Sequence, residues 1–276
     1  MSGPEPRPWR SLLFVPGARP DRFEKAASAG ADLVCIDLED AVAPGGKDEA
    51  RRATLDFLAR YEGEATVGLR VNAVGSDVGA ADLEALKGAT GVRFVMVPKP
   101  TGTGELDAVA AAYDAPMLIP VMETARAIQT AGAIADHPAV VAGVYGAIDL
   151  AADIGCTLDW EAQLYARSAC ALAFGAARKV LFDVPYLDVK DPEGLKAETR
   201  RAKTLGIHAR AAIHPAQLGP IHEALAPTPD EVARAQRIVD AFEAAEGGVA
   251  LLDGKMIELP VIKSARRVLA LAAPRA

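Results

Sequence analysis

Eight short apolar runs, separated by amphipathic segments, recur along the chain up to about residue 215. Each run is continuously apolar rather than alternating, which is typical of strands buried on both faces. Eight strand–helix units in succession predict an α/β fold, a (β/α)8 TIM barrel, and 276 residues suit such a barrel as one domain. An open doubly wound sheet is the main alternative, and the count of eight favours the barrel. The runs are SLLFVP (from Ser11), DLVCIDLE (Asp32), TVGLRVN (Thr66), RFVMVPK (Arg93), MLIPVME (Met117), VVAGVYGAID (Val140), KVLFDVPYL (Lys179) and ARAAIHP (Ala209).

A C-terminal extension, residues 226–276, follows the predicted barrel at residues 1–225 and has no place in a minimal barrel. The stretch TPDEVARAQRIVDAFEAAEGG predicts a long helix, with Thr228 as N-cap and Glu231 completing a capping box. VALLDGKMIELP predicts a hairpin around Asp253-Gly254, and VIKSARRVLALAA predicts a last helix. We expect the extension to pack on the barrel, extend over its mouth or reach a neighbouring subunit.

The charge and apolar pattern of the chain exclude several classes of protein. A net charge of -7 and a pI of about 5.2 argue against nonspecific nucleic-acid binding, which needs a basic face. No apolar run approaches the roughly 18 residues of a membrane span, and the start MSGPEPRPWR lacks the apolar region of a signal peptide. Three cysteines without a CxxC pair predict a reduced, cytoplasmic setting.

Two acids follow neighbouring strands where a barrel carries its chemistry, at the carboxyl ends. We expect Glu123 to end strand five and Asp149 to end strand six. Two carboxylates so placed can share one hard cation such as Mg2+. The alternative is that each acid is the N-cap of the helix after it, although glutamate is a poor cap.

A cluster of acids ends strand two, in VCIDLEDAV: Asp37, Glu39 and Asp40. Burying clustered carboxylates costs several kcal/mol each unless they are paired or bound to a metal. Arg70, which ends strand three in LRVN, can grip a substrate carboxylate in a bidentate fork or form a structural ion pair with Glu39 or Asp40. Lys99, in VPKP, is a cation at the rim or a solvated loop lysine.

The first βα loop is locally basic, with Arg19, Arg22 and Lys25 in or just after it. A phosphate-rich ligand suits this edge, helped by the helix N-terminus near Pro20. The alternative is a solvated helix face, which we favour for Lys25. The chain has no GxSxG motif and no zinc-binding histidine pattern.

A set of motifs from Arg10 to about Ala270 resembles the citrate lyase β-subunit-like CoA-ester lyases of the HpcH/HpaI aldolase superfamily, relatives of malyl-CoA and citramalyl-CoA lyases. The motifs are RSLLFVPGARPDRFEKA, IDLEDAVAPGGKDEAR, LRVN, VPKP, METARAI, IHPAQL, PTPDEVARAQRIVDA and DGKMIELPVIKSARRVL. No single motif is specific, but the set in this order is.

The resemblance implies a barrel of the phosphoenolpyruvate/pyruvate type, usually trimeric or a dimer of trimers. It implies that Glu123 and Asp149 hold Mg2+ and that Arg70 binds the keto-acid part and stabilises the enolate. Glu39 and Asp40 would position Arg70 and metal-bound water. The basic residues of the first loop would bind the coenzyme.

The chain departs from the family pattern at two places. Many members have Glu-Asp where this chain has Ile148-Asp149, so the substrate is expected to differ. Several members carry an aspartate in the tail, donated by a neighbouring subunit as acid/base, where this chain has Glu258. The longer side chain shifts the carboxyl, and catalytic geometry is sensitive to such shifts; alternatively, Glu258 is only a surface residue of the hairpin.

These observations predict a Mg2+-dependent carbon–carbon lyase that cleaves or forms a short 3-hydroxyacyl-CoA, giving a 2-keto acid and an acyl-CoA. The expected partners are therefore a CoA thioester, a 2-keto acid and further copies of the chain in a homotrimer or hexamer, with no nucleic acid and no membrane. One alternative is an aldolase of free hydroxy-keto acids, which Asp40 disfavours because those enzymes have a histidine there. Another is an accessory citrate lyase β-like subunit that needs a carrier partner.

Overall fold

The computed structural model describes residues 9–113, 117–245 and 251–272, which form two compact units. One unit runs from Trp9 to Ala224, and the other includes the chain from Leu225 onward. Within the described ranges, no helix has both the length and the apolar character needed to cross a bilayer.

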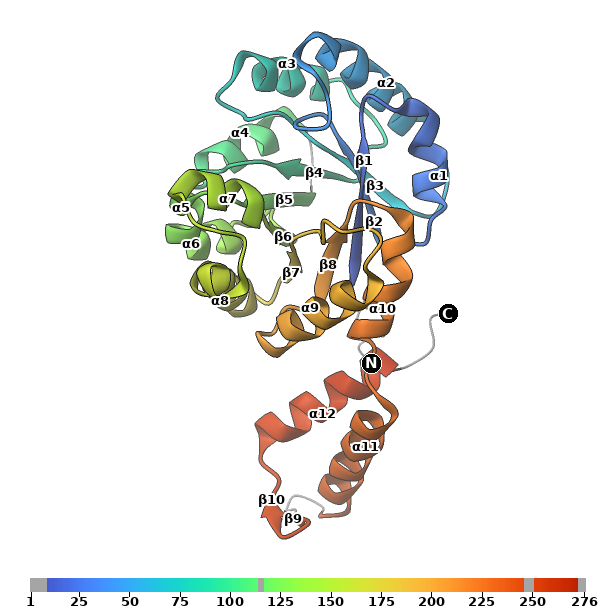
Figure 1. Ribbon diagram of the computed structural model, residues 1–276, viewed down its shortest axis with the longest axis vertical. Helices are drawn as coiled ribbons and strands as arrows, with labels where there is room; N and C mark the ends of the chain where they lie inside the picture. Colours follow the sequence, from blue (N-terminus) through green and yellow to red (C-terminus); the bar gives the residue numbers. More distant parts are fainter. Residues whose placement is uncertain (1–8, 114–116, 246–250, 273–276) are drawn as a thin grey trace. The chain divides into compact units, whose positions relative to one another are not determined.

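The first unit is a closed barrel of eight parallel strands in sequence order, with β1 also paired to β8. Figure 1 shows the strands inside and the helices around them. The predicted barrel is therefore confirmed, with its strands at the predicted runs. The strands are β1 (Ser11–Pro16), β2 (Leu33–Asp37), β3 (Thr66–Arg70), β4 (Phe94–Val97), β5 (Met117–Met122), β6 (Ala142–Tyr145), β7 (Val180–Asp183) and β8 (Ala209–Ala212).

Helices follow every strand of the barrel, and three short 3-10 turns accompany them. The helices are α1 (Phe23–Ala27), α2 (Lys47–Arg60), α3 (Asp77–Leu86), α4 (Gly104–Ala112), α5 (Ala125–Gln129), α6 (Ala131–Asp136), α7 (Ala147–Ile154), α8 (Trp160–Ala176), α9 (Pro192–Thr204) and α10 (Leu218–Leu225). The 3-10 turns are η1 (Pro20–Arg22), η2 (Pro44–Gly46) and η3 (Pro215–Gln217).

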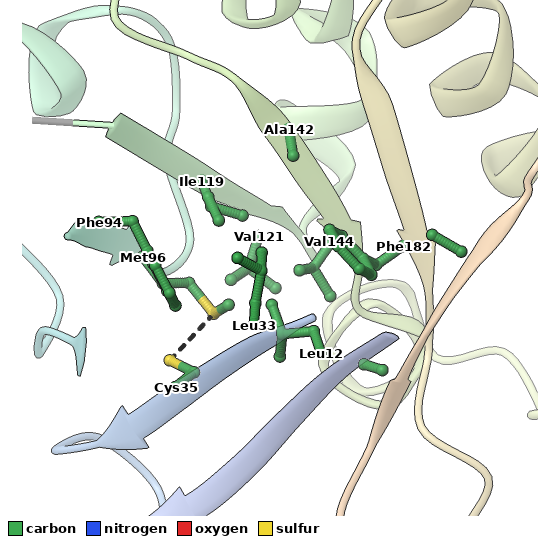
Figure 2. Close-up of a cluster of buried hydrophobic side chains, with 12 residues drawn as sticks. Leu12, Leu33, Cys35, Phe94, Met96, Ile119, Val121, Ala142, Val144 and Phe182 are labelled. Carbon is green, nitrogen blue, oxygen red and sulfur yellow. Dashed lines mark hydrogen bonds between the residues drawn. The ribbon is translucent and has the colours of Figure 1, made fainter. Parts of the chain in front are cut away.

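The barrel interior is packed with a cluster of apolar side chains from seven of the eight strands, all but β3 (Figure 2). Leu12, Leu33 and Phe94 are completely buried, and the thiol of Cys35 lies 4.0 Å from the sulfur of Met96. Burial raises the pKa of the Cys35 thiol well above its ordinary value. All three cysteines are free, as predicted. Because side chains fill the barrel interior, a ligand site has room only at the ends of the strands.

The second unit contains α11 (Pro229–Ala244), a hairpin of β9 (Leu251–Leu252) and β10 (Lys255–Met256), and α12 (Leu259–Ala272). The predicted capping box at Thr228 and Glu231 is confirmed, since each side chain accepts from the other's backbone N–H. Asp253 and Gly254 both have positive φ, as a two-residue hairpin turn requires. Residues 249 and 250 of the predicted hairpin lie outside the described residues.

Candidate active site at the carboxyl ends of the strands

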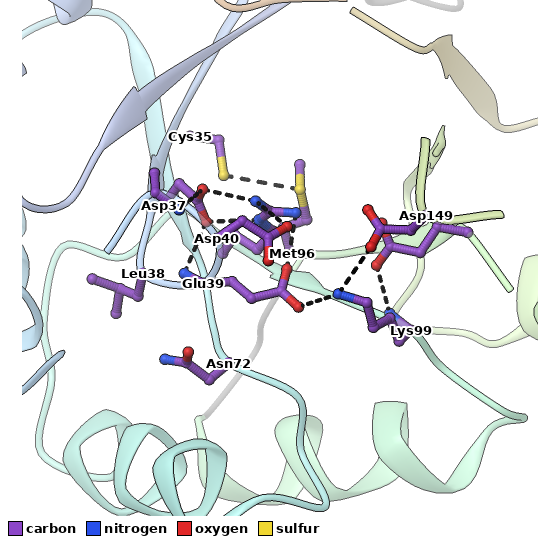
Figure 3. A network of polar contacts seen from close by, with 12 residues as sticks. Cys35, Asp37, Leu38, Glu39, Asp40, Asn72, Met96, Lys99 and Asp149 are labelled. Atoms are coloured by element: carbon purple, nitrogen blue, oxygen red, sulfur yellow. Dashed lines mark hydrogen bonds and ion pairs between the residues drawn. The ribbon is translucent and has the colours of Figure 1, made fainter. Parts of the chain in front are cut away.

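A cavity of about 240 Å3 lies at the carboxyl ends of the strands. Apolar side chains make up most of its wall, and the polar lining consists of Asp37, Asp40, Arg70, Glu123 and Asp149. Apolar pockets with a few convergent polar groups are typical of small-molecule sites. Figure 3 shows the polar network around this cavity.

Arg70 is the last residue of β3, and its register partner on β2 is Asp37. The Nε and Nη2 groups of Arg70 donate to the two carboxylate oxygens of Asp37, each at 2.7 Å. Burial alone would lower the pKa of Arg70, but the hydrogen bonds and charge of Asp37 raise it above the ordinary value. The predicted ion pairs of Arg70 with Glu39 and Asp40 are present, but the bidentate partner, Asp37, was not predicted from the sequence. The missed signal is that neighbouring parallel strands end together, at Asp37 and Arg70.

Glu39 lies between two cations. Its carboxylate is 2.9 Å from Arg70 Nη1, a charge contact without hydrogen-bond geometry, and it accepts a hydrogen bond from Lys99 Nζ at 2.7 Å. Burial raises the pKa of Glu39, and the two cations oppose that rise. The side chain of Asp40 is 57% exposed, and its carboxylate lies 3.4 Å from Arg70 Nη2. This is the longest and most exposed contact that Arg70 makes with these three acids, and therefore the weakest.

Lys99 follows β4 and has the positive φ of 46°, which is unusual for a residue other than glycine. In this conformation its backbone N–H donates to Glu123 at 2.9 Å, while its ammonium bonds Glu39 and lies 3.5 Å from Asp149. Strained backbone of this kind concentrates at functional sites. The structure therefore places Lys99 within the polar network, not among solvated loop lysines.

Glu123 follows β5 directly and is 1% exposed. Burial, followed by the negative charge of Glu39, raises the pKa of Glu123 to about 8. Gly146 keeps the space beside this carboxyl clear, because a Cβ at that position would lie 2.9 Å from Glu123 Oε2. The glycine was not identified as a site residue from the sequence.

Asp149 lies in the first turn of α7, not at the end of strand six as the sequence predicted. β6 ends at Tyr145, and the chain turns into the helix at Gly146. Asp149 still lines the same cavity as Glu123, and both contact Lys99. The N-cap alternatives are wrong for both acids, because Thr124 caps α5 and Gly146 precedes α7.

The charges at this site do not balance. Five carboxylates, those of Asp37, Glu39, Asp40, Glu123 and Asp149, surround the two cations of Arg70 and Lys99. A third cation, Lys47, donates to the backbone carbonyls of Leu38 and Glu39, so the acids still outnumber the cations. Such an excess of buried negative charge is costly unless a proton or a cation offsets it.

The donor atoms fit magnesium. Glu123 and Asp149 offer carboxylate oxygens, and Mg2+ is commonly held by one or two carboxylates while it keeps water or substrate oxygens as its other ligands. Among the described residues, no group of three or more His, Cys, Asp or Glu side chains could hold a metal by itself.

The other predicted site residues do not line this cavity. Arg19, Arg22 and Lys25 are exposed: Arg19 directly precedes η1, Arg22 ends it and Lys25 lies on α1. Arg19 pairs with Asp21 at 2.7 Å. Glu258 belongs to the second unit and is exposed. Its backbone carbonyl accepts from Val261 and Ile262, which places it at the start of α12. Coenzyme binding by the basic loop and proton transfer by Glu258 therefore stay predictions.

Two family models match the chain. Residues 10–215 match HpcH/HpaI aldolase/citrate lyase, and residues 163–274 match C-C bond lyase of the TIM-barrel fold. Together they span both units described above.

Individual relatives agree with these models. A (3S)-malyl-CoA thioesterase of Cereibacter sphaeroides is 37% identical over 274 residues, covering 95% of this chain and 94% of the relative. The mitochondrial citramalyl-CoA lyase of Rattus norvegicus is 30% identical over 291 residues, covering 96% and 86%. The crystal structure of protein CitE from Mycobacterium tuberculosis with magnesium, acetoacetate and coenzyme A superposes with a TM-score of 0.84 at 34% identity, covering 96% of this chain and 98% of that one. The family predicted from the motifs is confirmed: the chain belongs to the HpcH/HpaI aldolase/citrate lyase family.

Proposed function

We propose that this chain is a Mg2+-dependent carbon–carbon lyase that cleaves or forms the bond between the 2-keto acid and acyl-CoA halves of a short 3-hydroxyacyl-CoA. The observation that carries the proposal is that Glu123 and Asp149 line one cavity with Arg70 and share Lys99 as a neighbour. Related proteins named as a malyl-CoA thioesterase and a citramalyl-CoA lyase support the substrate class. The solved relative with magnesium and coenzyme A supports the cofactor and the thioester partner.

Glu123 and Asp149 are the residues that would hold Mg2+. When bound there, the ion supplies Lewis acidity toward the carbonyl and carboxylate oxygens of the keto acid. Ionised Glu123 is what this role requires. Burial and the charge of Glu39 raise the pKa of its carboxyl, and a bound dication would lower that pKa. We expect the ammonium of Lys99 to leave Asp149 when the dication arrives, since its 3.5 Å contact there is longer than its 2.7 Å bond to Glu39.

Arg70 is the group that stabilises negative charge on the substrate. Asp37 fixes the guanidinium through two hydrogen bonds, so its direction is set before substrate binds. The long contact to exposed Asp40 is the one that an incoming carboxylate or enolate oxygen can replace. Glu39 then acts by holding both Arg70 and Lys99 rather than by touching the reacting atoms.

Four further residues that do not line this cavity complete the proposed function. Arg19, Arg22 and Lys25 would bind the coenzyme phosphates. Glu258 would transfer a proton in the active site of a neighbouring copy, within a cytoplasmic homotrimer or hexamer. Exposure of all four side chains leaves them accessible for these roles.

Incubation of the purified chain with malyl-CoA and citramalyl-CoA tests the proposal. Chromatography should show acetyl-CoA together with glyoxylate or pyruvate when Mg2+ is present, and no cleavage after chelation. Free malate, free citramalate and a free hydroxy-keto acid, such as a 4-hydroxy-2-oxo acid, should not react. Cleavage that persists without a divalent ion would refute the metal-dependent lyase, and cleavage of the free acids alone would favour the aldolase alternative.

Thioester hydrolysis is a second candidate, because a relative of 37% identity is named as a malyl-CoA thioesterase. The two activities give different products from malyl-CoA: hydrolysis yields free CoA and malate, whereas the lyase yields acetyl-CoA and glyoxylate. The same assay also separates an accessory role, since a subunit that needs a carrier partner would be inactive alone.

A further inference from the structure

A second cavity, of about 300 Å3, adjoins the candidate active site. It lies between the start of α7, the start of α8 and the loop after β7. Ile148, Val184 and Pro185 line both cavities, so the two spaces share a wall. The proposed function uses the first cavity and assigns nothing to the second.

Apolar side chains with unusually high exposure lie at the mouth of the second cavity. Ile148, Leu158 and Leu187 are 44%, 51% and 56% exposed, and all three line it. Single exposed leucines are ordinary, but apolar side chains that converge on one hollow mark a place for an apolar ligand group.

One wall of the cavity is rigid before any ligand arrives. Two guanidiniums lie over the ring of Trp160, with Arg167 at 4.3 Å and Arg201 at 4.4 Å from its centroid. Arg167 is itself 3% exposed and donates to the completely buried carboxylate of Asp183 at 2.9 Å. A preformed wall reduces the entropy cost of binding, which favours use as a subsite.

The charges of the second cavity disfavour an anionic occupant. Arg167, the only cation of the lining within the described residues, pairs with Asp183, and Glu198 pairs with Arg210, so the carboxylate of Asp188 is the charge of the lining that no ion pair offsets in the described part of the chain. A neutral apolar group is therefore favoured over a second carboxylate.

The position of the cavity identifies which part of the substrate would enter it. Ile148 is adjacent to Asp149, the residue proposed to bind the metal next to the keto acid, whereas the loop proposed for the coenzyme phosphates follows β1. We infer that the second cavity is a subsite for the apolar side chain of the 2-oxo acid, and that the chain accepts 2-oxo acids with side chains longer than the methyl group of pyruvate. This inference rests on the proposed function.

The reaction with such an acid balances without any further reactant. The acyl-CoA gives up one α-proton to a base, and its α-carbon forms the new bond to the keto carbon. The keto oxygen takes up a proton and becomes the 3-hydroxyl. Cleavage is the reverse, and in either direction only the length of the side chain on the keto carbon changes.

Condensation rates along a chain-length series test the subsite. With Mg2+ and acetyl-CoA, kcat/KM should rise roughly fourfold per methylene, the value of one buried CH2, from pyruvate through 2-oxobutanoate to 2-oxopentanoate. Oxaloacetate should react less well than 2-oxobutanoate. The double variant Leu158→Ala/Leu187→Ala should lose most of this gradient and keep its rate with glyoxylate, whereas Leu172→Ala, at a 76% exposed position of α8 away from the cavity, should keep the gradient.

The subsite inference is overturned if pyruvate reacts better than 2-oxopentanoate, or if the double variant slows every acid equally. Fluorescence separates this failure from failure of the proposed function. The chain has two tryptophans, so Trp9→Phe leaves Trp160 as the only one, and binding of the 2-oxo acids can be followed without turnover. If no acid condenses, the lyase proposal fails. The subsite then survives only if Trp160 emission still changes more strongly with 2-oxopentanoate than with pyruvate.

Discussion

Two clusters of buried charge lie in the barrel unit, and they differ in balance. Around Arg70 and Lys99, five carboxylates face two cations. The other cluster contains two arginines and two acids, since Asp183 pairs with Arg167 and Arg210, and Arg210 also pairs with Glu198. Asp183 and Arg210 are completely buried.

The comparison separates a structural cluster from a functional one. A balanced buried network satisfies its own charges, so removing one partner destabilises the fold. A network with excess negative charge is incomplete by itself and is stabilised by a proton or a cation from outside. The left-handed backbone of Lys99 and the raised pKa of Glu123 both belong to the network around Arg70, which is the one with excess negative charge.

The largest effect is expected from Glu123→Gln. The variant keeps the shape of the side chain but removes one proposed metal ligand, so kcat/KM should fall on the order of 1,000-fold. Because the wild-type carboxylate is buried among like charges, the variant should be at least as stable as the metal-free parent. Steady-state kinetics and thermal melting check both points. Full activity with a normal response to Mg2+ would contradict the site.

Asp183→Asn should have the opposite profile. It leaves Arg167 and Arg210 without their shared buried acid, which should lower the free energy of unfolding by about 3–5 kcal/mol. Urea denaturation followed by circular dichroism measures this loss. If Asp183→Asn unfolds at the same urea concentration as the parent, then charge balance does not identify a structural cluster.

Asp37→Asn tests positioning inside the functional cluster. One hydrogen-bonding oxygen remains, but the fixed orientation of Arg70 is weakened, so kcat/KM should fall about 10- to 100-fold. If Asp37 acts through Arg70, the loss should appear mainly in kcat, and Mg2+ affinity measured by calorimetry should change little. An equal loss of Mg2+ affinity would instead place Asp37 in direct support of the metal.

The smallest expected effect is a pH dependence of stability. Folded Glu123 has a pKa of about 8, above the ordinary value of 4.5, so between these pH values the folded state binds more protons than the unfolded state. The metal-free protein should therefore lose stability as pH rises through this range, by a few degrees in Tm. Added Mg2+ should raise Tm more at pH 8 than at pH 6, because a smaller fraction of Glu123 is protonated at pH 8 and binding of the ion then displaces fewer protons. Calorimetry of the parent and of Glu123→Gln at pH 6 and pH 8 measures this change in Tm. An identical change of Tm with pH in the variant would contradict the assignment to Glu123.

The barrel could be predicted because burial on both faces makes parallel strands continuously apolar, a local signal repeated eight times. Glu123 could be predicted as a site residue because it follows a strand directly. The predicted position of Asp149 was wrong, because the residue lies in the first turn of α7 rather than at the end of a strand. The apolar run continues from β6 into α7, so it does not reveal that the strand ends and a helix begins at Gly146.

Other features depend on contacts that no local pattern records. The bidentate pair of Asp37 with Arg70 follows from strand register, and the reach of Lys99 to three acids follows from its left-handed backbone. The cluster around Asp183 joins β7, β8, α8 and α9 through charged residues within otherwise ordinary helices and strands. The predicted role of Glu258 depends on a neighbouring copy of the chain.

A crystal of the protein soaked with Mg2+ and pyruvate tests the central claim most directly. We predict one ion about 2.0–2.1 Å from a carboxylate oxygen of Glu123 and one of Asp149, with pyruvate oxygens among its other ligands and the Lys99 ammonium withdrawn from Asp149. An ion bound elsewhere, or a cavity in which Lys99 still bridges the acids at saturating Mg2+, would contradict the account.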